Sequence, residues 1–142
     1  MNIAIFGSTG SVGRQALDVV RQSEGSLSVI ALACRSSIEL FAEQIAEFRP
    51  RVAAVYKEEF LEPLKKAVEK RLPNADVTFL SGPESWAQLP IFPDVERILF
   101  ASSGLTALPA MEKAVAASLS EYGPTAKIAV IPKGPYVLAQ VA

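Results

Sequence analysis

The sequence is poor in the residue types that build disulfides and metal sites. It has no histidine and a single cysteine, Cys34, so an internal disulfide is impossible and the commonest ligand of zinc and iron is missing. We therefore expect no metal site in this chain. The 14 basic and 15 acidic side chains give a formal charge of −1, which supplies no broad positive field for nucleic acid phosphates. The composition argues against nucleic acid as a partner.

The sequence also lacks a long apolar run. The run near its start, residues 3–6, has no basic stretch before it and leads at once into glycine, so it is neither a signal peptide nor a membrane span. Half of the 142 residues are hydrophobic and a fifth are charged, which is typical of a soluble folded domain. We expect one cytoplasmic domain over residues 1–142 and no membrane partner.

What the chain does contain is a regular alternation of short β-rich runs and longer helical segments. This alternation is typical of a parallel sheet with crossover helices. The sequence predicts an α/β fold, a Rossmann-like doubly wound parallel sheet in a single domain. Strands are expected at residues 2–6, 28–33, 52–55, 77–80, 97–100 and 127–131. Helices are expected over residues 12–20, from 38 to 48, from 58 onward and over 106–119, while the stretch around Trp86 gives no clear prediction.

Apolar spacing indicates which helix faces are buried. The first helix is expected to bury Val12, Ala16, Val19 and Val20, and the second to bury Ile38, Phe41, Ile45 and Phe48. Ser36 and Glu39 have the spacing of a capping box at the start of the second helix.

The most informative motif is the glycine-rich loop between the first strand and the first helix, Gly7-Ser8-Thr9-Gly10-Ser11-Val12-Gly13. In a phosphate-binding loop of this kind the first glycine allows a sharp turn, the second lets a pyrophosphate approach the backbone, and the third lets the helix pack closely. Free N–H groups at the helix start would hold the anion. We expect the hydroxyls of Ser8 and Thr9 to add donors. The alternative is a tight turn that binds nothing.

The end of the second strand discriminates between dinucleotides. An acidic residue there would accept hydrogen bonds from the ribose of NAD and repel a 2′-phosphate, but this sequence has Cys34-Arg35-Ser36-Ser37. Arg35 offers a fork of donors to a phosphate, and the serines offer hydroxyls, so NADPH is the predicted cofactor. The alternative makes Arg35 a solvated loop residue and Ser36 a helix cap.

A second loop at the carboxyl end of a strand is Ala101-Ser102-Ser103-Gly104. Such loops line the ligand crevice of parallel sheets, so Ala101, Ser102 and Ser103 are candidates for contact with ribose or nicotinamide. An ordinary turn at Gly104 is an equally good interpretation.

These motifs resemble the opening of the 1-deoxy-D-xylulose 5-phosphate reductoisomerases. The stretch from Gly7 through Ala-Leu-Asp18-Val-Val is similar to the family's GSTGSIG…LDV, and Val29-Ile-Ala-Leu32, Glu43-Gln44 and Glu47-Phe48-x-Pro50 continue the likeness. The resemblance covers most of the chain, weakens after Leu105, and corresponds to about the first third of a family member.

The resemblance implies an amino-terminal NADPH-binding domain of an enzyme of isoprenoid precursor synthesis. It also implies Mg²⁺ or Mn²⁺ in a following catalytic domain, with acidic ligands beyond residue 142. Where the family has ANKES, this chain has Ile131-Pro-Lys133-Gly-Pro, which keeps only the lysine. Lys133 is a candidate for contact with nicotinamide, or else a surface residue. We expect the chain alone to be inactive.

Other functions are weaker matches. The Tyr-x-x-x-Lys pair of short-chain dehydrogenases is absent, and Cys34 falls at the adenosine end, away from where a semialdehyde dehydrogenase needs its nucleophile. A non-catalytic NADP-binding or partner-binding module of the same descent stays open. Residues 132–142 end in the apolar stretch Tyr136-Val-Leu-Ala-Gln-Val-Ala, which we expect to be covered by a protein partner or a further domain.

Overall fold

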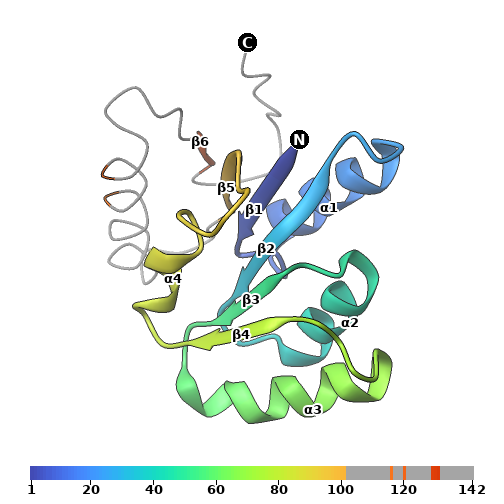
Figure 1. Cartoon of the computed structure of the whole chain (residues 1–142), viewed down its shortest axis with the longest axis vertical. Coiled ribbons are helices and arrows are strands. Elements are labelled where there is room, and N and C mark those ends of the chain that lie inside the picture. The colour runs from blue at the N-terminus through green and yellow to red at the C-terminus, as the bar shows by residue number, and fades with distance from the viewer. Residues whose placement is uncertain (102–115, 117–119, 121–128, 132–142) are drawn as a thin grey trace.

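The described strands form one six-stranded, wholly parallel sheet. The computed structural model describes residues 1–101, 116, 120 and 129–131. The strand order is β4-β3-β2-β1-β5-β6, and every neighbouring pair runs parallel (Figure 1). The strands are β1 (Asn2–Phe6), β2 (Ser28–Cys34), β3 (Val52–Val55), β4 (Thr78–Ser81), β5 (Arg97–Ala101) and β6 (Ala129–Ile131). The predicted doubly wound α/β fold is confirmed.

Helices cover both faces of the sheet. Helices α1 (Ser11–Gln22), α2 (Ile38–Phe48) and α3 (Leu61–Arg71) lie on one face, and the short α4 (Ser85–Gln88) lies on the other (Figure 1). Right-handed crossovers explain this arrangement. Three crossovers carry the chain from β1 outward to β4 in one direction, and the next returns across the sheet to place β5 on the far side of β1.

Each face of the sheet has its own apolar core. Under α1–α3 the core includes Ile5, Leu32, Phe41, Ile45 and Leu64, all fully buried. The opposite core is built around Phe6, Trp86 and Leu89, with the Phe6 and Trp86 rings packed edge to face at 5.2 Å. Because both faces are covered, β2 and β3 are buried along nearly their whole length and read in sequence as continuous apolar runs.

Three local predictions need correction. The capping box is wrong, because α2 begins at Ile38 after Ser37, which makes no side-chain cap hydrogen bond; Glu39 instead accepts a 2.8 Å hydrogen bond from Arg71 of α3. The buried stripe of α1 is Gly13, Leu17 and Val20, while Val12 and Val19 are only half-buried.

The third correction concerns the helix expected from residue 58. A 3-10 turn, η1 (Glu58–Phe60), comes first, and the α-helix starts at Leu61. The unassigned stretch around Trp86 holds α4 and packs that ring into the core. The helix predicted over residues 106–119 lies outside the described residues except at position 116.

The topology places the carboxyl ends of three neighbouring strands at one edge of the sheet. β1 lies between β2 and β5, and the order of the strands reverses there. The carboxyl ends of these parallel strands, at Phe6, Cys34 and Ala101, therefore meet at one edge, which is where ligands bind in open α/β sheets. None of the helices in the described part of the chain combines the length and apolarity that a bilayer crossing requires.

Candidate nucleotide-binding site

The glycine-rich loop folds as a tight turn fastened to the neighbouring strand. The N–H groups of Gly7 and Ser8 both donate to the carbonyl oxygen of Ala33, at 2.8 and 3.1 Å. Gly10 N–H donates back to Gly7 O at 3.0 Å. Gly7 has a φ of +74°, a left-handed conformation that a residue with a Cβ rarely adopts. The backbone confirms the role predicted for Gly7, which is to allow a sharp turn after the strand.

The three glycines differ in what the fold itself requires. A Cβ on Gly7 would lie 2.0 Å from Ala101 O, and a Cβ on Gly13 would lie 2.2 Å from Gly7 O and 2.6 Å from Ser8 Cα. Neither position has room for a side chain. At Gly10 the nearest atom would be Gly7 O at 3.4 Å, and φ is −74°. The described residues therefore give no steric reason for glycine at position 10.

The start of α1 presents backbone donors without a side-chain acceptor. Gly10 is the N-cap residue and has no side chain with which to cap the helix. The first-turn N–H groups of a helix have no intrahelical partner, and the positive end of the helix dipole lies beside them. The amides of Ser11, Val12 and Gly13 occupy this turn. Such a turn suits an anion such as a pyrophosphate.

Ser8 does not match its predicted role as a hydroxyl donor. It is fully buried, and its hydroxyl donates a 2.7 Å hydrogen bond to Gln44 Oε1 on α2. Gln44 Nε2 donates in return to the Ser8 carbonyl at 2.9 Å. The side chain of Ser8 therefore fixes the loop against α2, because its polar atoms are satisfied inside the protein. Thr9 is half-buried.

The loop after β2 lies directly beside the glycine-rich loop. Phe6 pairs with Ala33 in the parallel register, so the chain leaves β1 and β2 at the same level. Arg35, Ser36 and Ser37 follow and are all exposed. Cys34 is fully buried, and this burial raises the pKa of its thiol to about 12. A buried thiol with a raised pKa is a packed residue and a poor nucleophile.

The third loop starts at Ala101, which is buried at the end of β5 and contacts the turn at Gly7. The structure thus brings together the glycine loop, Arg35–Ser37 and Ala101 at one sheet edge. Ser102, Ser103 and Lys133 lie outside the described residues. In the described part of the chain no group of three or more His, Cys, Asp or Glu side chains is placed to hold a metal ion.

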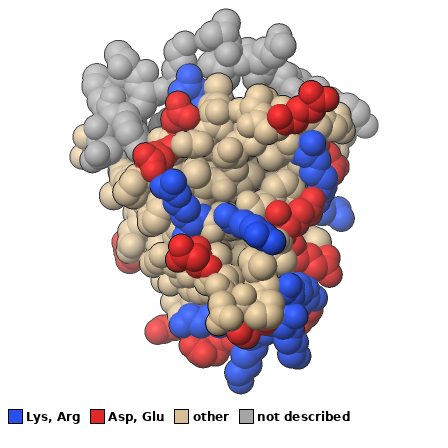
Figure 2. All heavy atoms as spheres, turned by 45° about the vertical axis from the view of Figure 1, so that its right-hand side comes forward, with Lys and Arg blue, Asp and Glu red and all other residues tan. Residues whose placement is uncertain are grey.

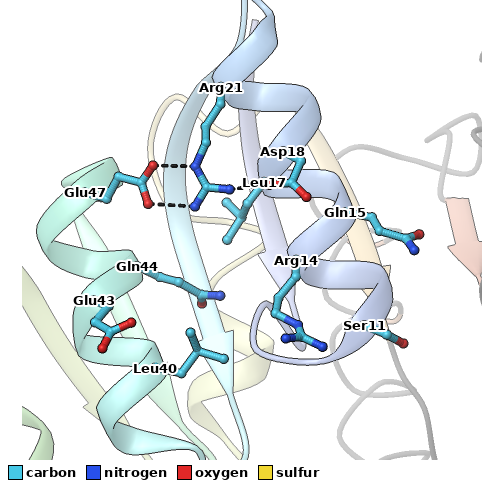
Figure 3. Close-up of a pocket in the computed structure, with 10 residues that line it drawn as sticks. All are labelled: Ser11, Arg14, Gln15, Leu17, Asp18, Arg21, Leu40, Glu43, Gln44 and Glu47. Atoms are coloured by element: carbon cyan, nitrogen blue, oxygen red, sulfur yellow. Dashed lines mark hydrogen bonds and ion pairs between the residues drawn. The ribbon is translucent and has the colours of Figure 1, made fainter.

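A groove of about 340 Å³ between α1 and α2 opens next to these loops, and sequence reasoning missed it. At one end the Arg21 guanidinium bonds both carboxylate oxygens of Glu47 and also pairs with Asp18 (Figure 3). The bonds from Arg21 lower the pKa of Glu47. At the other end are Arg14 and Leu40. Basic and acidic side chains are interspersed on the face of the molecule that Figure 2 shows.

Comparison with known proteins identifies relatives of this chain. The family model described as 1-deoxy-D-xylulose 5-phosphate reductoisomerase matches residues 3–120. The protein of that name from Heliobacterium modesticaldum is 38% identical over 138 residues, which are 96% of this chain and 34% of the relative. The one from Chlamydia pneumoniae is 39% identical over 111 residues, 78% of this chain and 28% of the relative. The chain spans about a third of the length of these curated relatives.

Solved structures share the fold. A DOX-P reductoisomerase in complex with magnesium superposes with a TM-score of 0.75 at 22% identity, covering 92% of this chain and 36% of that one. The 1-deoxy-D-xylulose 5-phosphate reductoisomerase of Zymomonas mobilis in complex with NADPH gives a TM-score of 0.70 at 21% identity, covering 82% and 29%. The fold of this chain is therefore the one that these structures share over the matched residues.

Proposed function

We propose that this chain, which belongs to the 1-deoxy-D-xylulose 5-phosphate reductoisomerase family, binds NADPH at the edge formed by the ends of β1, β2 and β5. The observation that carries the proposal is the contrast among the three loop glycines. Contacts with the described residues leave no room for a side chain at Gly7 and Gly13, whereas at Gly10 they do. A missing side chain at that point leaves room for a ligand to touch the backbone.

Different residues around this edge would bind different parts of the cofactor. The first-turn amides of α1 would hold the pyrophosphate, with Thr9 and Ser11 beside it. Arg35, Ser36 and Ser37 would bind the 2′-phosphate, since a guanidinium and hydroxyls suit a phosphate dianion. Ala101, Ser102, Ser103 and Lys133 would lie toward the nicotinamide. NADPH supplies a hydride when bound, and these residues orient it.

A Gly10→Val variant tests cofactor binding. Its side chain would occupy the space of the pyrophosphate without a backbone clash, so NADPH binding should be lost while the far-ultraviolet circular dichroism stays that of a folded α/β protein. Binding is measured by calorimetric titration up to millimolar cofactor. Absence of binding to the unmodified chain, or equal binding to both proteins, would contradict the proposal.

The family's whole reaction is a further proposal for a protein that contains this chain. We propose that residues 1–142 by themselves do not convert 1-deoxy-D-xylulose 5-phosphate, because hydride transfer needs a substrate held against the nicotinamide. Steady, substrate-dependent NADPH oxidation by the pure chain with Mg²⁺ or Mn²⁺ would show the reverse.

A second candidate function is a non-catalytic NADP-binding or partner-binding module. It is favoured by Ile131-Pro-Lys133-Gly-Pro, which lacks the Asn, Glu and Ser that the family places around the lysine. In either case residues 132–142 would be covered by a further domain or a protein partner. The mass of the native protein distinguishes the two candidates, because a reductoisomerase subunit should be about three times as long as this chain.

A further inference from the structure

One cation in the groove between α1 and α2 has no acidic partner among the described residues. Arg21 is paired with Glu47 and Asp18, and Glu43 lies 3.7 Å from Arg71 of α3. Arg14 lines the same groove and makes no ion pair or side-chain hydrogen bond with any described residue. Arg14 is an exposed residue, so solvent and dissolved anions have access to it.

Arg14 lies at the end of the groove that adjoins the nucleotide loops. Its N–H donates to Gly10 O at 2.9 Å, which places it one helical turn after the loop. Its side chain extends toward the turn of the glycine-rich loop and toward Leu40, while the Arg21–Glu47 pair closes the opposite end (Figure 3). Leu40 is in the first turn of α2, which starts directly after Ser37. This end of the groove is therefore flanked by Arg14 on α1 and by the Arg35–Ser37 loop.

We infer that Arg14 is a second residue that determines cofactor specificity, by binding the 2′-phosphate of NADPH from the α1 side of the groove. The inference rests on the proposed NADPH function. The 2′-phosphate lies where NAD-dependent domains have an acidic residue at the end of the second strand. In this chain that position is Arg35, at the end of β2, and Arg14 lies one helical turn after the glycine-rich loop that follows the neighbouring strand β1. Two guanidinium groups suit a phosphate that carries up to two negative charges.

The other charged residues that line the groove are Arg21, Asp18, Glu43 and Glu47, and each of the three carboxylates is paired with an arginine. Glu43 and Glu47 each lie beside an arginine, Arg71 and Arg21 respectively. The amide of Gln44 is engaged by Ser8. Arg14 is therefore the lining cation that makes no ion pair with a described residue, and it lies at the end of the groove nearest the glycine-rich loop (Figure 3).

The test compares ligands that differ only in the 2′-phosphate. Dissociation constants of NADPH and NADH, and of adenosine 2′,5′-bisphosphate and adenosine 5′-monophosphate, are measured for the unmodified chain and for Arg14→Gln. We expect NADPH and the bisphosphate to weaken about tenfold, the size expected for one partly exposed charge-assisted contact, while NADH and the monophosphate change less than about twofold. Arg14→Lys, which keeps the charge, should retain part of the affinity.

Lys66→Gln is the matched control, since it removes one exposed positive charge from α3 on the same face of the sheet. It should change none of the four constants by more than about twofold. If Arg14→Gln weakens the binding of NADPH and NADH equally, or of neither, Arg14 does not bind the 2′-phosphate. The proposal that the chain binds NADPH is unaffected by that result. Failure of the unmodified chain to bind any of the four ligands overturns the proposed function itself.

Discussion

Ser8 and Gln44 join the glycine-rich loop to α2 through two reciprocal hydrogen bonds. The Ser8 hydroxyl donates to Gln44 Oε1 at 2.7 Å, and Gln44 Nε2 donates to the Ser8 carbonyl at 2.9 Å. Both residues are almost completely buried. A buried polar pair that is fully satisfied fixes one geometry, because breaking it would strand polar atoms away from water. The loop that would hold the pyrophosphate is thereby held against the second crossover helix.

Gln44→Leu should destabilise the protein by about 1 to 3 kcal/mol, because it removes the partner of both Ser8 groups without much change in volume. The free energy of unfolding is measured by urea titration with the fluorescence of Trp86, the single tryptophan. Gln15→Leu on the exposed side of α1 is the control and should cost less than about 0.5 kcal/mol. Equal costs for the two variants would show that the buried pair contributes nothing special.

Gly13→Ala should destabilise the chain by about 2 to 4 kcal/mol, because its Cβ would lie 2.2 Å from Gly7 O and must force helix and loop apart. Gly10→Ala is the matched comparison. Its Cβ meets no atom closer than 3.4 Å, so the cost should be about 1 kcal/mol or less, the usual loss at an N-cap. The free energies of unfolding of both variants are measured by urea titration. A larger loss for Gly10→Ala than for Gly13→Ala would contradict the geometry.

Cys34 should be inert in the folded protein, because burial raises the pKa of its thiol to about 12. A thiol-specific reagent at pH 8 should modify no cysteine in native buffer and one per chain in urea. Above pH 9 the unfolded chain loses the thiol proton, whereas the folded chain keeps it. The free energy of unfolding therefore falls as the pH rises, by up to about 1.4 kcal/mol per pH unit.

A Cys34→Ala variant separates the contribution of the thiol to the pH dependence of stability from that of the lysines and tyrosines, which titrate in the same pH range. Its stability should be lower at pH 8 because a buried group is lost, but it should fall less steeply between pH 9 and pH 11 than that of the unmodified chain. If the free energy of unfolding fell equally steeply with pH in both proteins, the thiol would have the same pKa in the folded and the unfolded chain.

Arg35→Asp should reverse the preference between cofactors. Loss of the guanidinium should weaken NADPH by about tenfold to a hundredfold, while NADH binding stays equal or improves, because a carboxylate at this position accepts hydrogen bonds from the ribose. The measurement is a pair of dissociation constants for each protein. Arg97→Asp at the start of β5, at the opposite end of the strands from these loops, is the control. Equal weakening of the binding of both cofactors would show that Arg35 stabilises the fold and does not contact the 2′-phosphate.

Much of the fold could be predicted because its signals are local. Apolar runs of four to seven residues, helical spacing and the glycine loop determine where the strands and helices lie, and the predicted strand limits agree with the structure to within one residue at β2–β5. The chain alone also determines the turn at Gly7, since a left-handed residue after a strand requires glycine. These features follow from backbone sterics and periodicity, which act over a few residues.

The tertiary structure decided which polar side chains of the loops are bonded within the protein and which are exposed. Ser8 and Gln44 are 36 residues apart, and nothing in the sequence distinguishes a serine that bonds across to a neighbouring helix from one that faces a phosphate. The same holds for Arg14 and Arg21, one turning to the open end of the groove and the other to Glu47 (Figure 3). The reason is that the spacing and rotation of α1 against α2 come from packing of the whole core, which no local pattern encodes.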